Sequence, residues 1–267
     1  IDYRLRAERE VVRAEAGGGM TDPIRPIRFS HLRAYGRSAM HGHHAMTVDM
    51  EQTYAMERGT AVDALIFGTS KVIGYPGSVR RGKEYDAFVA AHPDHEILTM
   101  TEYDKSRRMA DAVLSNEEAV RLLKGERQKT LLFRWNGIDC RSTPDVIGTG
   151  FITELKTSVS ADPARFNWHA LRMHYHAQMR MQQLALSVGP FTLPDCYVVC
   201  VEAAEPYPVT CFQFTERALE QGEKLLVLWS ERLKNSEASD AYPPYALNIV
   251  PIDIPDEDAE LVFADDE

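Results

Sequence analysis

The sequence has no long apolar run. No stretch approaches the roughly 20 apolar residues that a membrane-spanning helix requires, and the first residues lack the basic-then-apolar pattern of a secretory signal. The chain contains four cysteines, without the close paired spacing of a disulfide framework. We therefore expect no membrane partner, a cytoplasmic location, and cysteines that are buried thiols rather than disulfides.

Basic residues are in the minority as well. Lys and Arg total 30 against 40 Asp and Glu, so the formal net charge is −10. Because Lys and Arg supply most phosphate contacts, this balance disfavours nucleic-acid binding without excluding it. Many of the acidic residues lie at 253–267, while basic clusters at 80–83 and 105–108 leave room for a local basic groove.

The composition is otherwise that of a globular protein, with 44% apolar and 26% charged residues. We expect one catalytic domain over residues 28–240, preceded by an extension or linker over 1–27 and followed by an acidic tail over 241–267. Two interpretations of the first segment stay open. Either Met20 is the natural start, or residues 3–15 form a helix joined to the domain by a glycine linker.

Turn residues and apolar patterns outline the remaining elements. We expect Ser30 to cap a first helix, an exposed loop at 74–82, and a long helix that begins after Pro163. That long helix covers about 164–187. The other expected helices cover about 50–67, 102–124 and 216–235, and two later strands cover 196–203 and 209–214.

The middle of the chain has the clearest strand pattern. Residues 130–135 form a strand candidate, Asn136-Gly137 is a strong hairpin signal, and 138–147 return as a second strand. After a turn at 148–150, residues 151–156 form a third strand. The sequence therefore predicts a mixed α/β (α+β) fold whose central mixed sheet contains an antiparallel meander and is flanked by helices.

Two charged residues of the third strand point to chemistry. Glu154 and Lys156 are two positions apart, so their side chains leave the same face of the sheet. A two-residue or four-residue turn would pair Asp145 with Ile152, one diagonal step from Glu154 on that face, whereas a three-residue turn would place it on the other face.

Carboxylates that face one point suit a hard cation such as Mg²⁺, for which Mn²⁺ is a substitute. The cation would polarise a phosphate and lower the pKa of a bound water, and Lys156 would position that water or offset the developing charge. This pattern indicates phosphodiester hydrolysis. The alternative is a surface salt bridge between Glu154 and Lys156.

Three short segments resemble one nuclease family. Pro144-Asp145, Glu154-Leu155-Lys156-Thr157 and Tyr175-His176-Ala177-Gln178 are similar to motifs of the PD-(D/E)XK nucleases, in particular the RecE-like and lambda-exonuclease-like (YqaJ-like) recombination branch. The resemblance covers about residues 28–235 and implies a restriction-endonuclease-like core. It further implies that Asp145 and Glu154 bind Mg²⁺, that Lys156 assists the attacking water, and that Gln178 supports Lys156 or the substrate.

Three further residues, Tyr175, Gln182 and Thr157, are candidates for substrate contacts. Tyr175, Gln178 and Gln182 share one helical face at i, i+3 and i+7, although for Gln178 ordinary helix polarity is the alternative. Thr157 adjoins the strand motif and is a further candidate for substrate contact.

An upstream segment, residues 56–66, looks like the first core helix of the same family, in which Gly-Thr-Ala precedes an active-site His. Asp63 stands at that position here and, as an oxygen donor, can still bind a metal. Glu57 is a candidate for substrate binding, with a solvated helix carboxylate as the alternative. A zinc site at His41, His43 and His44 is disfavoured for want of partners at ligand spacing. Poor spacing also disfavours an iron–sulfur cluster; the cysteines concerned are Cys140, Cys196, Cys200 and Cys211.

The resemblance implies a metal-dependent exonuclease that hydrolyses linear double-stranded DNA from its ends, in recombination or phage DNA metabolism in a bacterial or phage-infected cell. It also implies a ring-shaped homo-oligomer and a partner single-strand annealing protein. The alternative is a nuclease-fold module that binds DNA or a partner without cleavage, which the net acidity and Asp63 favour.

Overall fold

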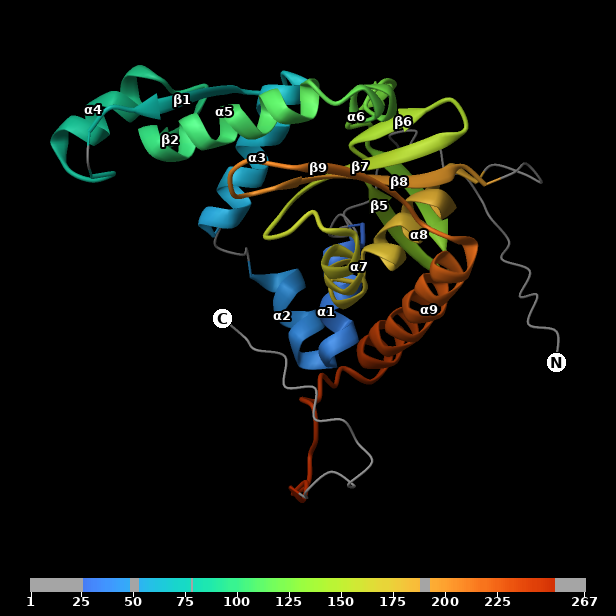
Figure 1. Ribbon diagram of the computed structural model, residues 1–267. Helices are drawn as coiled ribbons and strands as arrows, with labels where there is room; N and C mark the ends of the chain where they lie inside the picture. The colour runs from blue at the N-terminus through green and yellow to red at the C-terminus, as the bar shows by residue number, and fades with distance from the viewer. Residues whose placement is uncertain (1–25, 49–52, 78, 188–192, 253–267) are drawn as a thin grey trace, which may run out of the picture.

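A five-stranded mixed sheet lies at the centre of the computed structural model, which describes residues 26–48, 53–77, 79–187 and 193–252 (Figure 1). The strand order is β3-β6-β7-β8-β9. The β6 and β7 strands are antiparallel, β7 and β8 are parallel, and β8 and β9 are antiparallel. The strand bounds are β3 Glu126–Arg127, β6 Val146–Gly148, β7 Phe151–Ser158, β8 Asp195–Glu202 and β9 Val209–Gln213. The predicted fold class is confirmed.

Helices cover both faces of this sheet. Side chains that alternate along β7 and β8 point to opposite faces, so Leu155 and Val199 pack with one helical layer and Val198 and Cys200 with the other. The first layer consists of α3 (Tyr54–Phe67), α5 (Met100–Leu114) and α6 (Glu117–Leu122). The second consists of α7 (Pro163–Arg172) and α8 (Tyr175–Leu186).

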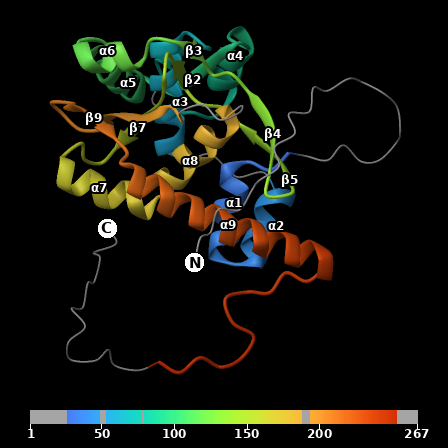
Figure 2. The ribbon, with the colours of Figure 1, turned by 90° about the vertical axis from the view of Figure 1, so that its right-hand side faces the viewer.

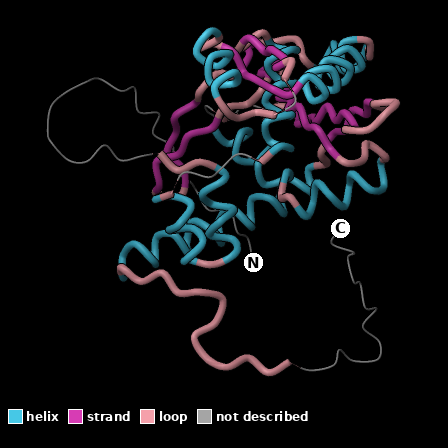
Figure 3. The backbone as a smooth tube through the Cα atoms, turned by 90° about the vertical axis from the view of Figure 1, so that its left-hand side faces the viewer, coloured by secondary structure: helices cyan, strands magenta, loops and turns pink. Residues whose placement is uncertain are grey.

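A long C-terminal helix supports the second layer. This helix, α9 (Glu216–Ser239), packs along α8 and also contacts α1 (Phe29–Arg37) and α2 (Ala39–Thr47), as Figure 2 shows. A buried cluster joins these helices to the hairpin of β4 (Leu131–Trp135) and β5 (Ile138–Ser142). Figure 3 shows the strands gathered in the upper part of the molecule, with α1, α2 and α9 below them.

The predicted hairpin at Asn136-Gly137 is confirmed. Both residues have positive φ, 48° and 79°, as a two-residue hairpin turn requires. The predicted second strand over 138–147 is wrong, because β5 ends at Ser142 and β6 begins at Val146 in a different sheet. Pro144, which has no amide hydrogen to donate to a ladder, lies between them.

The long helix predicted over 164–187 is two helices. His174 has a left-handed backbone, φ 59°, which separates α7 from α8. The helix predicted over 102–124 is likewise divided into α5 and α6, because the side chain of Asn116 accepts the Ala119 amide and starts a new helix. Ser30 is not a cap; it lies inside α1, whose N-cap residue is Arg28.

The loop predicted at 74–82 is correct only in part. Its first residues belong to β1 (Lys71–Tyr75), which pairs in parallel with β2 (His95–Thr99) across the helix α4 (Lys83–Ala91). The apolar runs of β1 and β2 are too short for their periodicity to identify them as strands in the sequence. Together with α5, these elements extend to one side of the central sheet (Figure 1).

Several expectations fall on residues outside the described ranges. These include Met20 as a start, a helix over 3–15, the acidic stretch 253–267, and the first residues of the helix predicted over 50–67, which is described from Tyr54. The division into extension, domain and tail stays a prediction. None of the helices in the described ranges is long and apolar enough to cross a membrane.

The close approach of α8 and α9 depends on Gly222. A methyl group added there would lie 2.6 Å from the carbonyl oxygen of His176 and 2.8 Å from the Cα of Ala177, both of them backbone atoms of α8. We predict that Gly222→Ala lowers the free energy of unfolding by about 1–3 kcal/mol, because two packed helices must separate.

Urea denaturation measures this change, with Glu220→Ala on the exposed side of α9 as the control. The control should stay within about 0.5 kcal/mol of the native chain. A Gly222→Ala protein as stable as the native chain would contradict the packing described.

Candidate active site

The carboxylate of Glu154 lies buried between β7 and α8. The residue is 3% exposed, and four donors surround its two oxygens. Lys156 Nζ and Gln178 Nε2 donate to Oε2 at 2.6 and 2.7 Å. Gln182 Nε2 and the backbone amide of Asp145 donate to Oε1 at 2.6 and 3.3 Å. Such complete satisfaction is what permits a charged group to be buried.

Asp145 reaches the same point through a two-residue turn. The β6–β7 register pairs Ile147 with Ile152 and Val146 with Thr153, so continuing it places Asp145 beside Glu154. The predicted partner, Ile152, is wrong by two residues, which leaves Asp145 on the expected face. The backbone amide of Leu155 donates to Asp145 Oδ2 at 2.8 Å, which holds the carboxylate against the strand.

One face of α8 presents three side chains to this carboxylate pair. Gln178 and Gln182 contact Glu154 directly, and Lys156 Nζ lies 5.2 Å from the ring centroid of Tyr175. The i, i+3 and i+7 spacing therefore places the three side chains on one face of α8, as expected. The alternative of a surface salt bridge does not describe the Glu154–Lys156 pair, because the Glu154 side chain is 4% exposed.

Asp63 approaches the site from α3, in the opposite helical layer. Burial raises the pKa of Asp63 to about 7; Lys156 opposes the rise and the charge of Glu154 adds to it. Burial and the neighbouring Glu154 also raise the pKa of Asp145 well above the usual aspartate value. These three carboxylates repel one another, and burial strengthens the repulsion because it removes them from solvent. A bound cation would relieve that repulsion.

Lys156 remains a cation in this site. Burial alone would lower the pKa of its ammonium group, but the charges of Glu154 and Asp145 and the hydrogen bond to Glu154 outweigh burial and raise it. A lysine with a raised pKa cannot serve as a proton acceptor near neutral pH. It can hold an anionic group by its charge.

The donor set fits a hard divalent cation bound by two carboxylates. Asp145 and Glu154 offer only oxygen, and Gln182 Oε1 is a buried acceptor without a hydrogen-bond partner among the described atoms. In the part of the chain that the structure describes, no three Asp, Glu, His or Cys side chains are arranged to hold a metal ion. Mg²⁺, which commonly keeps several waters, needs only one or two protein carboxylates. Asp63 as a third ligand stays a prediction.

Two of the proposed substrate contacts lie apart from these carboxylates. Thr157 alternates with Lys156 on β7 and therefore points to the opposite face. Its Oγ1 faces Gly59 of α3 there, 3.6 Å from the place that a Cβ would take on that glycine. Glu57 forms an ion pair with Arg80 at 2.8 Å rather than remaining solvated. In the second basic cluster, Arg108 pairs with Glu205.

Arg33 is a cation near the site that the sequence did not single out. Its charge acts on Tyr175 and on His174, where the segment between α7 and α8 passes α1. Arg33 belongs to α1, which precedes every motif in the sequence. No rule of sequence spacing connects Arg33 with Tyr175 or His174. Only the folded chain, which brings Arg33 near His174 and Tyr175, could have revealed it.

The four cysteines are free thiols, and three of them are buried. Burial raises the pKa of the Cys140, Cys196 and Cys200 thiols to about 12, so they stay protonated. Buried thiols are therefore confirmed at these three positions, whereas Cys211 is only partly buried. Of the three neighbouring histidines, His41 contacts Ser38 and His43 stacks against Tyr242, an arrangement of ordinary packing.

Comparisons with known proteins identify a family and a fold. A family model described as a PDDEXK-like domain of unknown function (DUF3799) matches residues 29–248. The crystal structure of a "Putative exonuclease" from Eubacterium rectale superposes with a TM-score of 0.63, at 13% identity, over 86% of this chain and 90% of that chain. At that identity the likeness concerns the fold. No curated protein sequence matches the chain.

The raised pKa of Asp63 predicts how the stability of the fold depends on pH. Folding raises the pKa of Asp63 from its ordinary value of 3.8 to about 7, so stability is lost as pH rises from about 4 to about 7 and returns in full only below about pH 4. Without metal, Asp63→Asn should therefore be more stable than the native chain at about pH 8, by on the order of 1–3 kcal/mol, and similar to it only at about pH 3–4.

Thermal unfolding in EDTA across this pH range measures the difference. Mg²⁺ should raise the melting temperature of the native chain more at about pH 8 than at about pH 6, since the cation competes with protons for the carboxylates. An Asp63→Asn protein less stable than the native chain at the higher pH would show that Asp63 is not under strain.

Proposed function

The chain belongs to the family of PDDEXK-like domains of unknown function, and from this premise we propose that it is a divalent-metal-dependent deoxyribonuclease that degrades linear double-stranded DNA from its ends. The observation that carries the proposal is the buried cluster in which Glu154 meets Lys156, Gln178 and Asp145. An ordinary structural salt bridge between Glu154 and Lys156 needs neither the carboxylate of Asp145 nor the glutamine amides of α8. A site for phosphodiester hydrolysis uses the second carboxylate to hold a cation and the amides to position the first.

Asp145 and Glu154 would hold the cation, Mg²⁺ or Mn²⁺, which when bound supplies a polarised phosphate and an acidified water. Gln178 and Gln182 fix the position of the Glu154 carboxylate through one hydrogen bond to each oxygen. They are positioning residues in this scheme. Their place on consecutive turns of α8 makes the carboxylate rigid before substrate arrives.

Lys156 would offset the negative charge that develops on the phosphate in the transition state. Its raised pKa keeps the ammonium group charged, and its contacts with Glu154 Oε2 and the Tyr175 ring hold it in the site. The lysine side chain is 21% exposed, so a substrate phosphate can reach it. This role needs no proton transfer from the lysine.

Action at duplex ends is supported by the motif resemblance and by the fold shared with a protein named an exonuclease. A role in recombination or phage DNA metabolism, a ring-shaped homo-oligomer, a single-strand annealing partner and a cytoplasmic location are proposed on the resemblance alone. Non-cleaving DNA binding is the competing function.

Cleavage of end-labelled linear duplex DNA in Mg²⁺ tests the proposal, with a covalently closed circle as the second substrate. The native chain should degrade the linear DNA only. Lys156→Ala should lose at least about a hundredfold in rate, because a charge aimed at the reacting phosphate is removed. Lys124→Ala, an exposed lysine beside α6 in the other helical layer, should keep the native rate.

Other outcomes separate the alternatives. Cleavage of the closed circle would indicate an endonuclease. No cleavage of either DNA in Mg²⁺ or Mn²⁺, with DNA still bound, would favour the non-cleaving module.

A further inference from the structure

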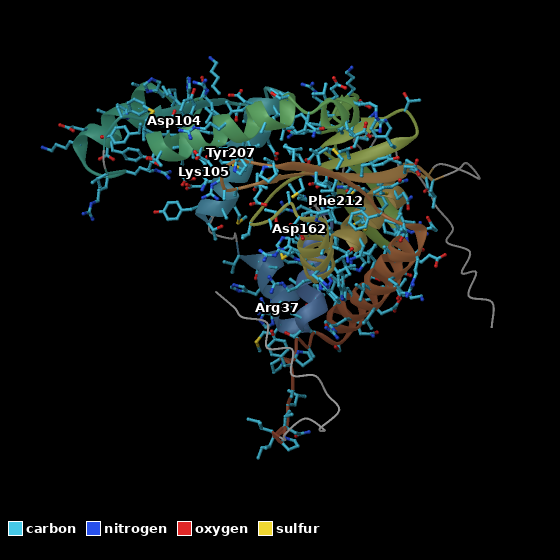
Figure 4. The ribbon with its side chains drawn as sticks, viewed as in Figure 1. Arg37, Asp104, Lys105, Asp162, Tyr207 and Phe212 are labelled. Atoms are coloured by element: carbon cyan, nitrogen blue, oxygen red, sulfur yellow. The ribbon has the colours of Figure 1, made fainter. Side chains whose placement is uncertain are left out.

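Helix α7 is held firmly against the sheet by its inner side. Phe166 and Ala170 are buried with Val198 and Cys200 of β8. Phe166 also stacks on Phe212 of β9, with ring centroids 4.5 Å apart and an interplanar angle of 24°. Figure 4 shows Phe212 and Asp162, the N-cap residue of α7, below the sheet near the centre of the view. These contacts fix which side chains the helix turns outward.

The two arginines of α7 share one flank with Trp168 and His169. At about 100° per residue, Arg165, Trp168, His169 and Arg172 fall within roughly 100° of the helix circumference. The opposite flank carries only uncharged side chains. The helix, Pro163–Arg172, contains no Asp or Glu, in a chain whose net charge is −10. We call Arg165, Trp168 and Arg172 the α7 flank.

This flank adjoins the candidate active site. The His169 ring contacts the Tyr175 ring edge to face, with centroids 5.8 Å apart, and Tyr175 lies 5.2 Å from Lys156 Nζ. His169 therefore links the flank to the lysine of the site through a single aromatic ring. A ligand bound along the flank would lead directly to Lys156.

Trp168 is the unusual member of the flank. Its side chain is 73% exposed, whereas the other two tryptophans of the chain, Trp135 and Trp229, are 6% and 3% exposed. A bare indole between arginines matches the two features that hold single-stranded nucleic acid: a flat ring for a base and cations for the phosphates.

We propose that the α7 flank binds a single-stranded part of the DNA substrate, with Trp168 stacked on a base and Arg165 and Arg172 on phosphates. The bound strand then passes Tyr175 and enters the site at Lys156. This assignment rests on the proposed nuclease function and adds to it a contact for an unpaired strand. A chain of net negative charge thus needs only a local basic surface to hold a polyanion.

Intrinsic fluorescence tests the proposal without any cleavage. The full-length chain is titrated in EDTA with an oligo(dT) of about 16 nucleotides, while the anisotropy of a labelled copy of the same oligonucleotide reports binding independently. Because Trp168 is the one exposed tryptophan of three, stacking should quench the solvent-accessible part of the emission. The quenching should follow the same binding curve as the anisotropy.

Variants separate stacking from charge. Trp168→Ala should weaken binding about tenfold, and Trp168→Phe should retain most of the affinity while losing the fluorescence change. Arg165→Ala and Arg172→Ala should each weaken binding. Each should also reduce the slope of the logarithm of the binding constant against the logarithm of salt concentration by about 1. Arg121→Ala, an exposed arginine on α6 in the other helical layer, is the matched control and should bind as the native chain does.

Binding without quenching, or native affinity in Trp168→Ala, would overturn the proposal, as would an absence of oligo(dT) binding. The cleavage assay keeps the two proposals apart. If the chain degrades linear duplex while Trp168→Ala binds oligo(dT) normally, only the α7 flank assignment fails. If no variant cleaves or binds DNA, the nuclease function fails with it.

Discussion

The structure depends on burying the carboxylate of Glu154. A charged oxygen pair removed from water costs several kcal/mol unless each oxygen finds donors, so the fold must bring donors to it from separate elements. Lys156 comes from the same strand, Gln178 and Gln182 come from α8, and the amide of Asp145 comes from the segment before β6. Removing any one element would leave a buried charge with too few partners.

Irregular features of the backbone serve this constraint. The turn at Thr149-Gly150 sets the register that brings Asp145 beside Glu154, and the break at Pro144 lets the chain leave one sheet and join another there. The left-handed His174 ends α7 and starts α8, so that Tyr175 opens the new helix beside Lys156. Gly222 then allows α9 to hold α8 at close range.

Local chemistry explains how much of this was predictable. The period of two placed Glu154 and Lys156 on one face, and the period of 3.6 placed Gln178 and Gln182 together, because both rules act over a few residues. The division of the helix at His174 had no such signal, since a non-glycine residue with positive φ depends on tertiary packing. The approach of Asp63 from the opposite layer was out of reach for the same reason and entered only through the resemblance.

The central claim is that the Asp145–Glu154 pair holds a divalent cation. Anomalous diffraction from crystals grown with Mn²⁺ tests it most directly, because the ion reports its own position. The account predicts a peak in contact with both carboxylates, with Lys156 displaced from Glu154 or sharing it. Ordered Mn²⁺ at other sites only, with the four donors still surrounding Glu154, would contradict it and leave the cluster a structural ion pair.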